Sequence, residues 1–483
     1  MLFHFTTFFC RLFIFLTYSV CYLSISQKNF LNLYQVGVSI VRPMLFLFNH
    51  YPLLKGCERL LMMIKRLQIF LCAVVAAFFC ACENPVQPNG GADDIPVDNS
   101  AGTCVPVTYP DEFIFLSWYE LVNINNKPLL NEYREFAAEW RLKMLKDAGF
   151  NVYFDYRLNS LEEAEALLKL GDNTGMKIIL ECPELHDSAQ TAMAVKAMSA
   201  HPSLYGYNVW DEPELFEYPE MIRRIKEIYK YDKKRPCYVN LFPNYGWDDW
   251  VEERYLETLR HYLKNVPVSF LSFDYYPVII DEDGNRTLRD AWYHNLEDIR
   301  TAAKEANVPI WSFALAKRHN PYPHPTLADL RVQHFSNLVY GAVAFQYFTT
   351  RAIVWKNAVV ADIYPIVKQV NGELKQMETI FLGADIKDIW HIGAEIPRGT
   401  KALEAYPAGV TRIDTGDSGA VVSYFTNHGK QYIAVVNRSC TDDMTLEVEF
   451  DAQAAHVAKD GTEIAVEQSY AVEAGDIRIF TWQ

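Results

Sequence analysis

The feature that most constrains this chain is a regular alternation of extended and helical patterns between residues 113 and 381. Eight short apolar or aromatic runs begin 26 to 40 residues apart, and an amphipathic segment follows each of them. Eight consecutive strand–helix units of this length match the (β/α)8 barrel, or TIM barrel. A doubly wound open sheet is the alternative, but such a sheet seldom needs eight consecutive units. We therefore expect an α/β protein with a barrel over residues 111–395. The runs begin at Phe113, Phe150, Met176, Leu204, Pro236, Ser269, Pro309 and Gly341.

The pattern changes after about Pro397, where short alternating strands replace the helices. Candidate strands at 420–426, 431–437 and 445–450 are separated by turn residues that include Asn427 and Gly429. We expect a small antiparallel, β-sandwich-like domain over residues 396–483.

The first 82 residues contain targeting signals rather than a globular domain. Residues 1–61 are apolar and nearly free of acids, and Met62 and Met63 precede Lys65, Arg66 and a second apolar run. A basic start, a short apolar run and small residues before a cysteine are typical of a bacterial lipoprotein signal peptide. The prediction is that translation begins at Met62 or Met63, that 1–61 is an upstream extension, and that 62–82 is the signal peptide. In the alternative, the run at 1–23 is a membrane anchor.

The cysteine that ends the predicted signal peptide is Cys82. We expect it to carry lipid and to hold the protein on a bacterial membrane, the outer membrane facing either the periplasm or the cell surface. Residues 83–110, which are rich in proline, glycine and polar side chains, read as a flexible tether.

Composition narrows the possible partners. After Cys82 the chain holds 38 basic and 59 acidic residues, a net charge of −21. Such an acidic body argues against a nucleic-acid partner. Only four cysteines remain after Cys82, widely spaced, which indicates neither a zinc site nor a disulfide framework. We expect no cofactor and no metal, and no pattern specifies an oligomeric state.

The stretch Leu204–Glu214, LYGYNVWDEPE, is the strongest candidate for chemistry. It reads as a buried strand that stops at two adjacent carboxylates, Asp211 and Glu212. Strand ends of a barrel carry the catalytic residues, so Glu212 is a candidate general acid for breaking a glycosidic bond. The simpler interpretation is a helix start, where acids favour the helix dipole.

The other strand ends are also rich in carboxylates and aromatic rings. Carboxylates supply acid, base or nucleophile, and aromatic faces stack on sugar rings. Trp247 and Trp250 follow the fifth strand in a loop, and we expect them to serve as sugar platforms. The catalytic candidates are Glu212, Asp211, Asp274 and Glu181, and the substrate-binding candidates are Trp118, Asp155, Arg157, Trp210, Asn240, Trp247, Tyr275, Tyr276, Lys317 and Trp355.

Three stretches together resemble a known family. They are WDEPE at the fourth strand, DYYP at the sixth and VNGELKQMETIFLGADIKDIWH from Val370 to His391, followed by the small β domain. This pattern is similar to bacterial TIM-barrel glycoside hydrolases related to family 42 and its clan, over roughly residues 112–483. The resemblance implies a carbohydrate substrate and an acid/base role for Glu212, with Asp211 in place of the clan's asparagine. The clan's nucleophile is a glutamate after the seventh strand, where WSFALAKR offers none.

The missing nucleophile leaves three interpretations open. Asp274 or Glu181 could be the second carboxylate. Asp211 and Glu212 could instead form the pair of a substrate-assisted N-acetylhexosaminidase, with Tyr275 or Tyr276 holding the acetamide. Finally, the chain could bind glycans without cleaving them. For either hydrolase, the pKa of Glu212 must be raised, and we expect Tyr207, Trp210 and Trp118 to raise it by desolvation.

Overall fold

The computed structural model describes residues 109–119, 132–246, 250–354 and 360–483. The predicted extension (1–61), the signal peptide with Cys82 and nearly all of the predicted tether lie outside these ranges, as do Trp247 and Trp355.

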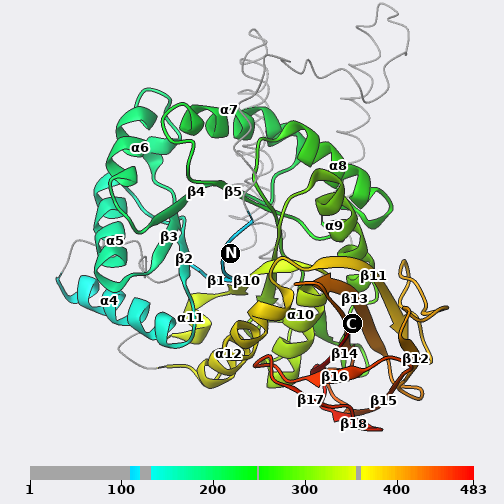
Figure 1. Ribbon diagram of the computed structural model, residues 1–483. Coiled ribbons are helices and arrows are strands. Elements are labelled where there is room, and N and C mark those ends of the chain that lie inside the picture. The colour runs from blue at the N-terminus through cyan, green and yellow to red at the C-terminus, as the bar shows by residue number, and fades with distance from the viewer. Residues whose placement is uncertain (1–108, 120–131, 247–249, 355–359) are drawn as a thin grey trace, which may run out of the picture. The chain divides into compact units, whose positions relative to one another are not determined.

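Eight parallel strands close into a barrel, as the alternation predicts (Figure 1). Each barrel strand pairs with the next barrel strand along the chain, and the last strand, β10, pairs with the first through the register Leu116↔Gln346. The strands are β1 (Ile114–Trp118), β2 (Val152–Asp155), β3 (Lys177–Leu180), β4 (Leu204–Asp211), β5 (Cys237–Leu241), β6 (Leu271–Phe273), β9 (Ile310–Leu315) and β10 (Ala342–Phe348).

The helices surround the barrel (Figure 1). Side chains cap the starts of two helices: the Ser160 side chain accepts from the Glu163 N–H, and Thr326 and Asp329 form a reciprocal capping box. At the first of these, the Glu163 carboxylate accepts from Asn159 instead of completing a box. The helices are α4 (Glu132–Asp147), α5 (Leu161–Thr174), α6 (Thr191–Ser199), α7 (Tyr218–Tyr229), α8 (Tyr255–Asn265), α9 (Trp292–Ala306), α10 (Leu327–Val339), α11 (Thr350–Ile353) and α12 (Tyr364–Phe381).

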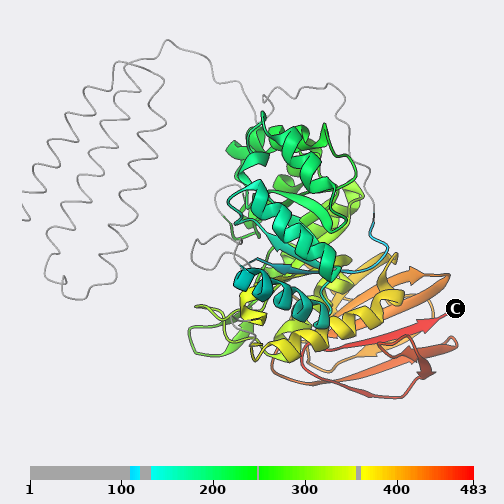
Figure 2. The same cartoon turned by 90° about the vertical axis from the view of Figure 1, so that its left-hand side faces the viewer.

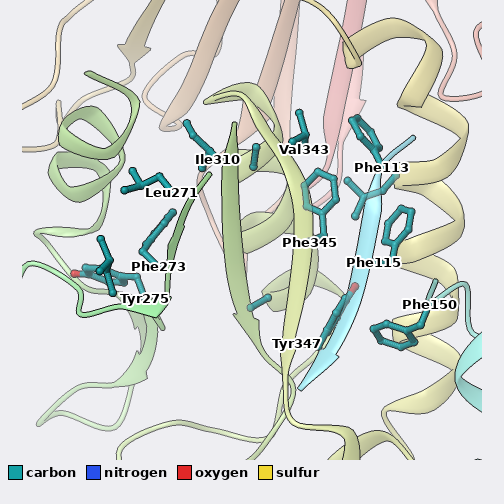
Figure 3. Packing of buried hydrophobic residues seen from close by; sticks show 14 of the residues in the cluster. Phe113, Phe115, Phe150, Leu271, Phe273, Tyr275, Ile310, Val343, Phe345 and Tyr347 are labelled. Carbon is teal, nitrogen blue, oxygen red and sulfur yellow. The ribbon is translucent and has the colours of Figure 1, made fainter. Parts of the chain in front are cut away.

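Alternate strand residues divide between two apolar layers. Inward-facing side chains such as Leu116, Phe154 and Trp311 fill the barrel. Outward-facing side chains such as Phe115 and Phe345 pack between strands and helices, as Figure 3 shows for β1, β10 and the neighbouring helix. A side chain's place at a strand end is therefore fixed by its position in this alternation.

The C-terminal region forms an antiparallel sandwich beside the barrel (Figure 2). A six-stranded sheet and a three-stranded sheet enclose a separate apolar core that includes Ile433, Leu446 and Phe480. The first strand of the larger sheet, β11 (Asp385–Ile392), begins before residue 396, so the predicted barrel range of 111–395 includes a strand of the sandwich. The other strands are β12 (Val410–Asp414), β13 (Ala420–Asn427), β14 (Lys430–Asn437), β15 (Met444–Phe450), β16 (Ala454–Val457), β17 (Glu463–Ala465), β18 (Tyr470–Val472) and β19 (Ile477–Trp482).

A buried arginine joins the two regions. Arg331 on α10 forms two hydrogen bonds with Glu373 of α12, at 3.0 and 2.6 Å, and one with Glu473 of the sandwich at 2.6 Å. Lys459 of the sandwich also reaches Glu373, at 3.0 Å. Among the helices in the described ranges, none is both long enough and apolar enough to cross a bilayer.

Candidate active site

The site is organised by an irregularity in β4. Asn208 pairs with Tyr238 of β5, but Trp210 pairs with the next residue, Val239, so Val209 is an extra residue in the strand. Asn208 faces the barrel interior, whereas both Val209 and Trp210 pack on the outer layer. Beyond this bulge Asp211 faces inward beside Asn240. If the strand were regular from Asn208 onward, Trp210 would face inward and Asp211 would face outward.

Glu212 follows the bulge in a left-handed backbone conformation, with φ of 51°. Left-handed conformations are uncommon for residues other than glycine, and they occur often at functional sites. The Glu212 N–H donates to the Asn240 carbonyl oxygen at 2.8 Å, which fixes this turn against β5.

Asn240 links two carboxylates. Its amide nitrogen lies 2.9 Å from Asp274 Oδ1 and 3.5 Å from Asp211 Oδ1. The Ser272 hydroxyl donates to the amide oxygen of Asn240 at 2.9 Å, which orients the amide so that its N–H2 faces the two acids. Asp211 and Asp274, from strands on either side of β5, are thus held at one point of the barrel's carboxyl end.

The environment raises the pKa of all three acids at this point. The pKa of Asp211 is raised to about 7, first by desolvation and then by the charge of Asp274, although hydrogen bonding from Asn240 lowers it. Desolvation, followed by the charges of Asp274, Asp211 and Glu214, raises the pKa of Glu212 to about 9. Desolvation also raises the pKa of Asp274, to about 6. Near neutral pH, Glu212 therefore keeps its proton while Asp274 is ionised.

Glu181, the remaining catalytic candidate, lies to one side of this trio. Its carboxylate accepts from Asn208 Nδ2 at 2.6 Å and lies 3.9 Å from His186 Nε2. Its charge contributes to the raised pKa of Asp211 but is not among the causes of the shift at Glu212. Asp274 is therefore the carboxylate that acts most strongly on Glu212.

Aromatic rings surround the carboxylates, and sequence reasoning missed several of them. The Trp118 ring stacks on Phe154 at 3.8 Å inside the barrel and is 3% exposed. Tyr276 contacts the Phe348 ring and the Tyr322 ring, each at 5.9 Å between centroids. The charges of Asp274, Glu212 and Asp211 all raise the pKa of the Tyr276 hydroxyl, after desolvation. The rings that were missed are Tyr119, Tyr156, Tyr245, Tyr322 and Phe348. Phe348 could have been found from the sequence, because the alternation of β10 places its side chain on the inward face.

Two tryptophans predicted to face sugar are positioned elsewhere. The bulge turns Trp210 toward α7, where the Arg224 guanidinium lies 4.7 Å from its ring. Trp250 is fully buried, and its Nε1 donates to the Pro213 carbonyl oxygen at 3.0 Å. The expectation that a loop tryptophan has no core to fill is wrong here, because Trp250 packs beneath the loop that follows Glu212.

Three other predicted residues lie in the outer layer of the barrel. Tyr275 is 2% exposed and points into the core between strands and helices (Figure 3), so of the two adjacent tyrosines only Tyr276 faces the carboxylates. Tyr207 donates to Asp232 at 2.9 Å on the same outer side and does not desolvate Glu212 as expected. Asp155 is buried, accepts from the Tyr153 hydroxyl and from the Arg157 N–H, and has its pKa raised to about 6 by desolvation.

Two cationic side chains make cation–π contacts with these aromatic rings. The guanidinium of Arg157 lies 4.3 Å from the Tyr119 ring and donates to the Tyr119 hydroxyl at 3.1 Å. Lys317 Nζ lies 5.5 Å from the Phe348 ring. Within the described part of the chain, no group of three or more His, Cys, Asp or Glu residues is arranged to hold a metal ion.

No protein-family model and no curated protein matches the chain. Among solved structures, it is similar to a trehalose-6-phosphate hydrolase from Bacillus licheniformis (8% identity, TM-score 0.45, covering 77% of this chain and 98% of that one). It is also similar to an α-amylase from Lactobacillus plantarum (11%, 0.40, 77% and 99%) and to an orotidine 5'-monophosphate decarboxylase from Methanocaldococcus jannaschii (10%, 0.33, 54% and 97%). A (β/α)8 barrel can support many different reactions, so the fold alone does not specify the reaction of this protein.

Proposed function

We propose that this protein is a glycoside hydrolase in which Glu212 is the general acid. The observation that carries the proposal is the placement of two carboxyl groups, Glu212 and Asp274, at the carboxyl end of the barrel, where desolvation raises the pKa of Glu212 to about 9 and that of Asp274 to about 6. Two carboxyl groups whose pKa values are pushed apart are the requirement for cleaving a glycosidic bond.

The reaction follows from these two protonation states. Glu212 donates its proton to the bridging oxygen as the bond from that oxygen to the anomeric carbon breaks. The ionised Asp274 stabilises the positive charge that develops on the sugar ring. One water supplies the hydroxyl that ends on the anomeric carbon and the proton that replaces the one Glu212 gave.

The choice of Asp274 over Glu181 as the second carboxylate rests on charge coupling and orientation. Asp274 contributes the largest charge effect on Glu212, and Asn240 holds it in place. Glu181 instead interacts with Asn208 and His186. The finer resemblance to the family 42 clan remains a prediction, because the acid after the seventh strand is absent and Asp274 comes from β6.

The test is to substitute each acid and measure turnover and binding separately. We expect Glu212→Gln to abolish release of reducing sugar from a panel of oligosaccharides and polysaccharides, while calorimetry still detects binding. Asp274→Asn should lose turnover as well, whereas Glu181→Gln, a matched carboxyl-to-amide change nearby, should lose less. Turnover by Glu212→Gln at the wild-type rate would remove this residue from the mechanism.

A substrate-assisted reaction is the second candidate, and the bulge in β4 favours it by turning Asp211 inward beside Glu212. In that mechanism the acetamido group of the substrate attacks the anomeric carbon and Asp211 orients it. Asp211→Asn would then lose turnover, Asp274→Asn would keep it, and only N-acetylhexosamine substrates would be cleaved. A protein that only binds glycans would show no turnover before any substitution.

We also propose that Cys82 anchors the enzyme to a bacterial outer membrane. The support is the sequence of residues 62–82, which ends in FCAC. Cells fed labelled palmitate should incorporate the label into the full chain and not into Cys82→Ala. Equal labelling of both chains would refute the anchor.

A further inference from the structure

Two cations at the carboxyl end of the barrel have no acidic partner among the residues that the structure describes. Arg289, which follows the hairpin of β7 (Val278–Ile280) and β8 (Arg286–Leu288), lies between two rings, 4.8 Å from Tyr245 and 5.6 Å from Tyr322. Its Nη2 donates to the Tyr322 hydroxyl at 3.3 Å, and its buried Nε has no acceptor. Within the described residues, neither Arg289 nor Lys317 forms an ion pair.

Two aromatic rings separate each cation from the catalytic acids. Tyr276 links them, because its ring contacts the rings of both Phe348 and Tyr322. Lys317 lies over the Phe348 ring, and Arg289 lies over the Tyr322 ring. The charges of Asp274 and Arg289 both act on the Tyr245 hydroxyl, in opposite directions. The cations and the acids therefore belong to the same end of the barrel.

These cations do not serve to neutralise the acids. Every charge that contributes to the pKa shifts of Asp211 and Glu212 is another carboxylate, and each of those charges raises the pKa. A cation placed to compensate an acid would lower the pKa of that acid. Arg289 and Lys317 instead have aromatic faces beneath them, which leaves them available to an external anion.

We propose that the substrate is an anionic glycan, a sugar bearing a carboxylate or a sulfate, and that Arg289 and Lys317 bind this group. The proposal rests on the proposed hydrolase, since it assigns the substrate of the same site. Tyr276 lies between the acids and the cations, so a sugar over its ring would place its glycosidic bond at Glu212 and its charged substituent toward Arg289 and Lys317. Guanidinium and ammonium groups donate charge-assisted hydrogen bonds to carboxylate and sulfate oxygens.

The experiment compares matched ligands in the Glu212→Gln background, where binding is read without turnover. The ligands are an oligosaccharide of uronic acids, its carboxyl-reduced neutral counterpart, and a sulfated neutral oligosaccharide. We expect an anionic ligand to bind more tightly than the neutral one, and Arg289→Met and Lys317→Met each to weaken that binding by about tenfold without changing neutral binding. Comparison of the uronate with the sulfate identifies the charged group.

The control is Arg318→Met, which removes an exposed cation next to Lys317 and should leave all affinities unchanged. Equal binding of neutral and anionic ligands, or an anionic preference that survives both Arg289→Met and Lys317→Met, would overturn the proposal. The affinities measured here test the anionic substrate. The turnover of the Glu212→Gln variant tests hydrolysis, so the two proposals can fail independently.

Discussion

At the scale of the residue, Glu212 combines two features that oppose folding. Its backbone is left-handed at φ 51°, which is strained for a side chain with a Cβ, and its carboxyl group is desolvated among other acids. The backbone conformation places the carboxyl group at the strand end, and the desolvation keeps it protonated. The residue therefore exchanges stability for function, as active-site residues often do.

The raised pKa of Glu212 makes stability depend on pH in a predictable direction. In the unfolded chain the carboxyl ionises near its ordinary pKa of 4.5, whereas in the folded protein its pKa is about 9. Between these values the unfolded state binds fewer protons, so this group lowers stability as the pH rises. We expect Glu212→Gln to unfold at a higher temperature than the wild type, with a difference that grows from pH 5 to pH 9.

Thermal unfolding of both proteins across this pH range provides the measurement. Glu139→Gln is a suitable control, since Glu139 lies on the outer helix α4 and pairs with Lys143. A difference between Glu212→Gln and the wild type that shrinks toward pH 9 would contradict a raised pKa.

At the scale of the element, periodicity predicted the eight barrel strands and their helices, but not which side chains face the site. The alternation of side chains predicts which face a residue occupies only if the strand has no bulge. The amino-acid composition of β4 gives no sign that Val209 is a bulge residue. Trp210 was therefore assigned to the wrong face. Trp250 was misplaced for a different reason, because a loop can carry a core residue when it folds over a neighbouring loop, here through Pro213.

Asn240 couples three strands, and its removal should shift the pH dependence of activity. Its amide donates to the charged forms of Asp211 and Asp274 and so lowers both pKa values. In Asn240→Leu these pKa values rise, so the acidic limb of the kcat/KM profile should move to higher pH. Ser272→Ala, which removes only the bond to the Asn240 amide oxygen, should move it less. An unmoved limb in a folded Asn240→Leu protein would argue against this coupling.

At the scale of the whole molecule, the barrel and the sandwich are joined by buried charges. Arg331 is 6% exposed and interacts with Glu373 of α12 and with Glu473 and Asp476 of the sandwich. Loss of one partner from such a buried network leaves charges uncompensated. The two regions should therefore unfold together.

We expect Arg331→Met to destabilise the protein by about 3 kcal/mol in urea unfolding, because it leaves Glu373 with Lys459, and Asp476 with Lys459 and Arg478, as the remaining cations for this buried network. Arg412→Met removes an exposed arginine that pairs with Asp414, Glu447 and Glu449 of the sandwich, and it should leave the urea midpoint nearly unchanged. Equal effects of the two substitutions would mean that the buried network does not join the two regions.

The bulge in β4 has a genetic consequence. Asp211 faces inward because the bulge takes up the extra residue Val209, so that Asn208 and Asp211 lie on the same face of the strand. An in-frame loss of the single codon for Val209 would remove the bulge and leave Asn208, Trp210 and Asp211 opposite Tyr238, Val239 and Asn240 in unbroken register, so Asp211 would still face inward. The gene can therefore lose this one codon without turning Asp211 away from the site, although the loss of one residue from a regular strand exchanges its two faces.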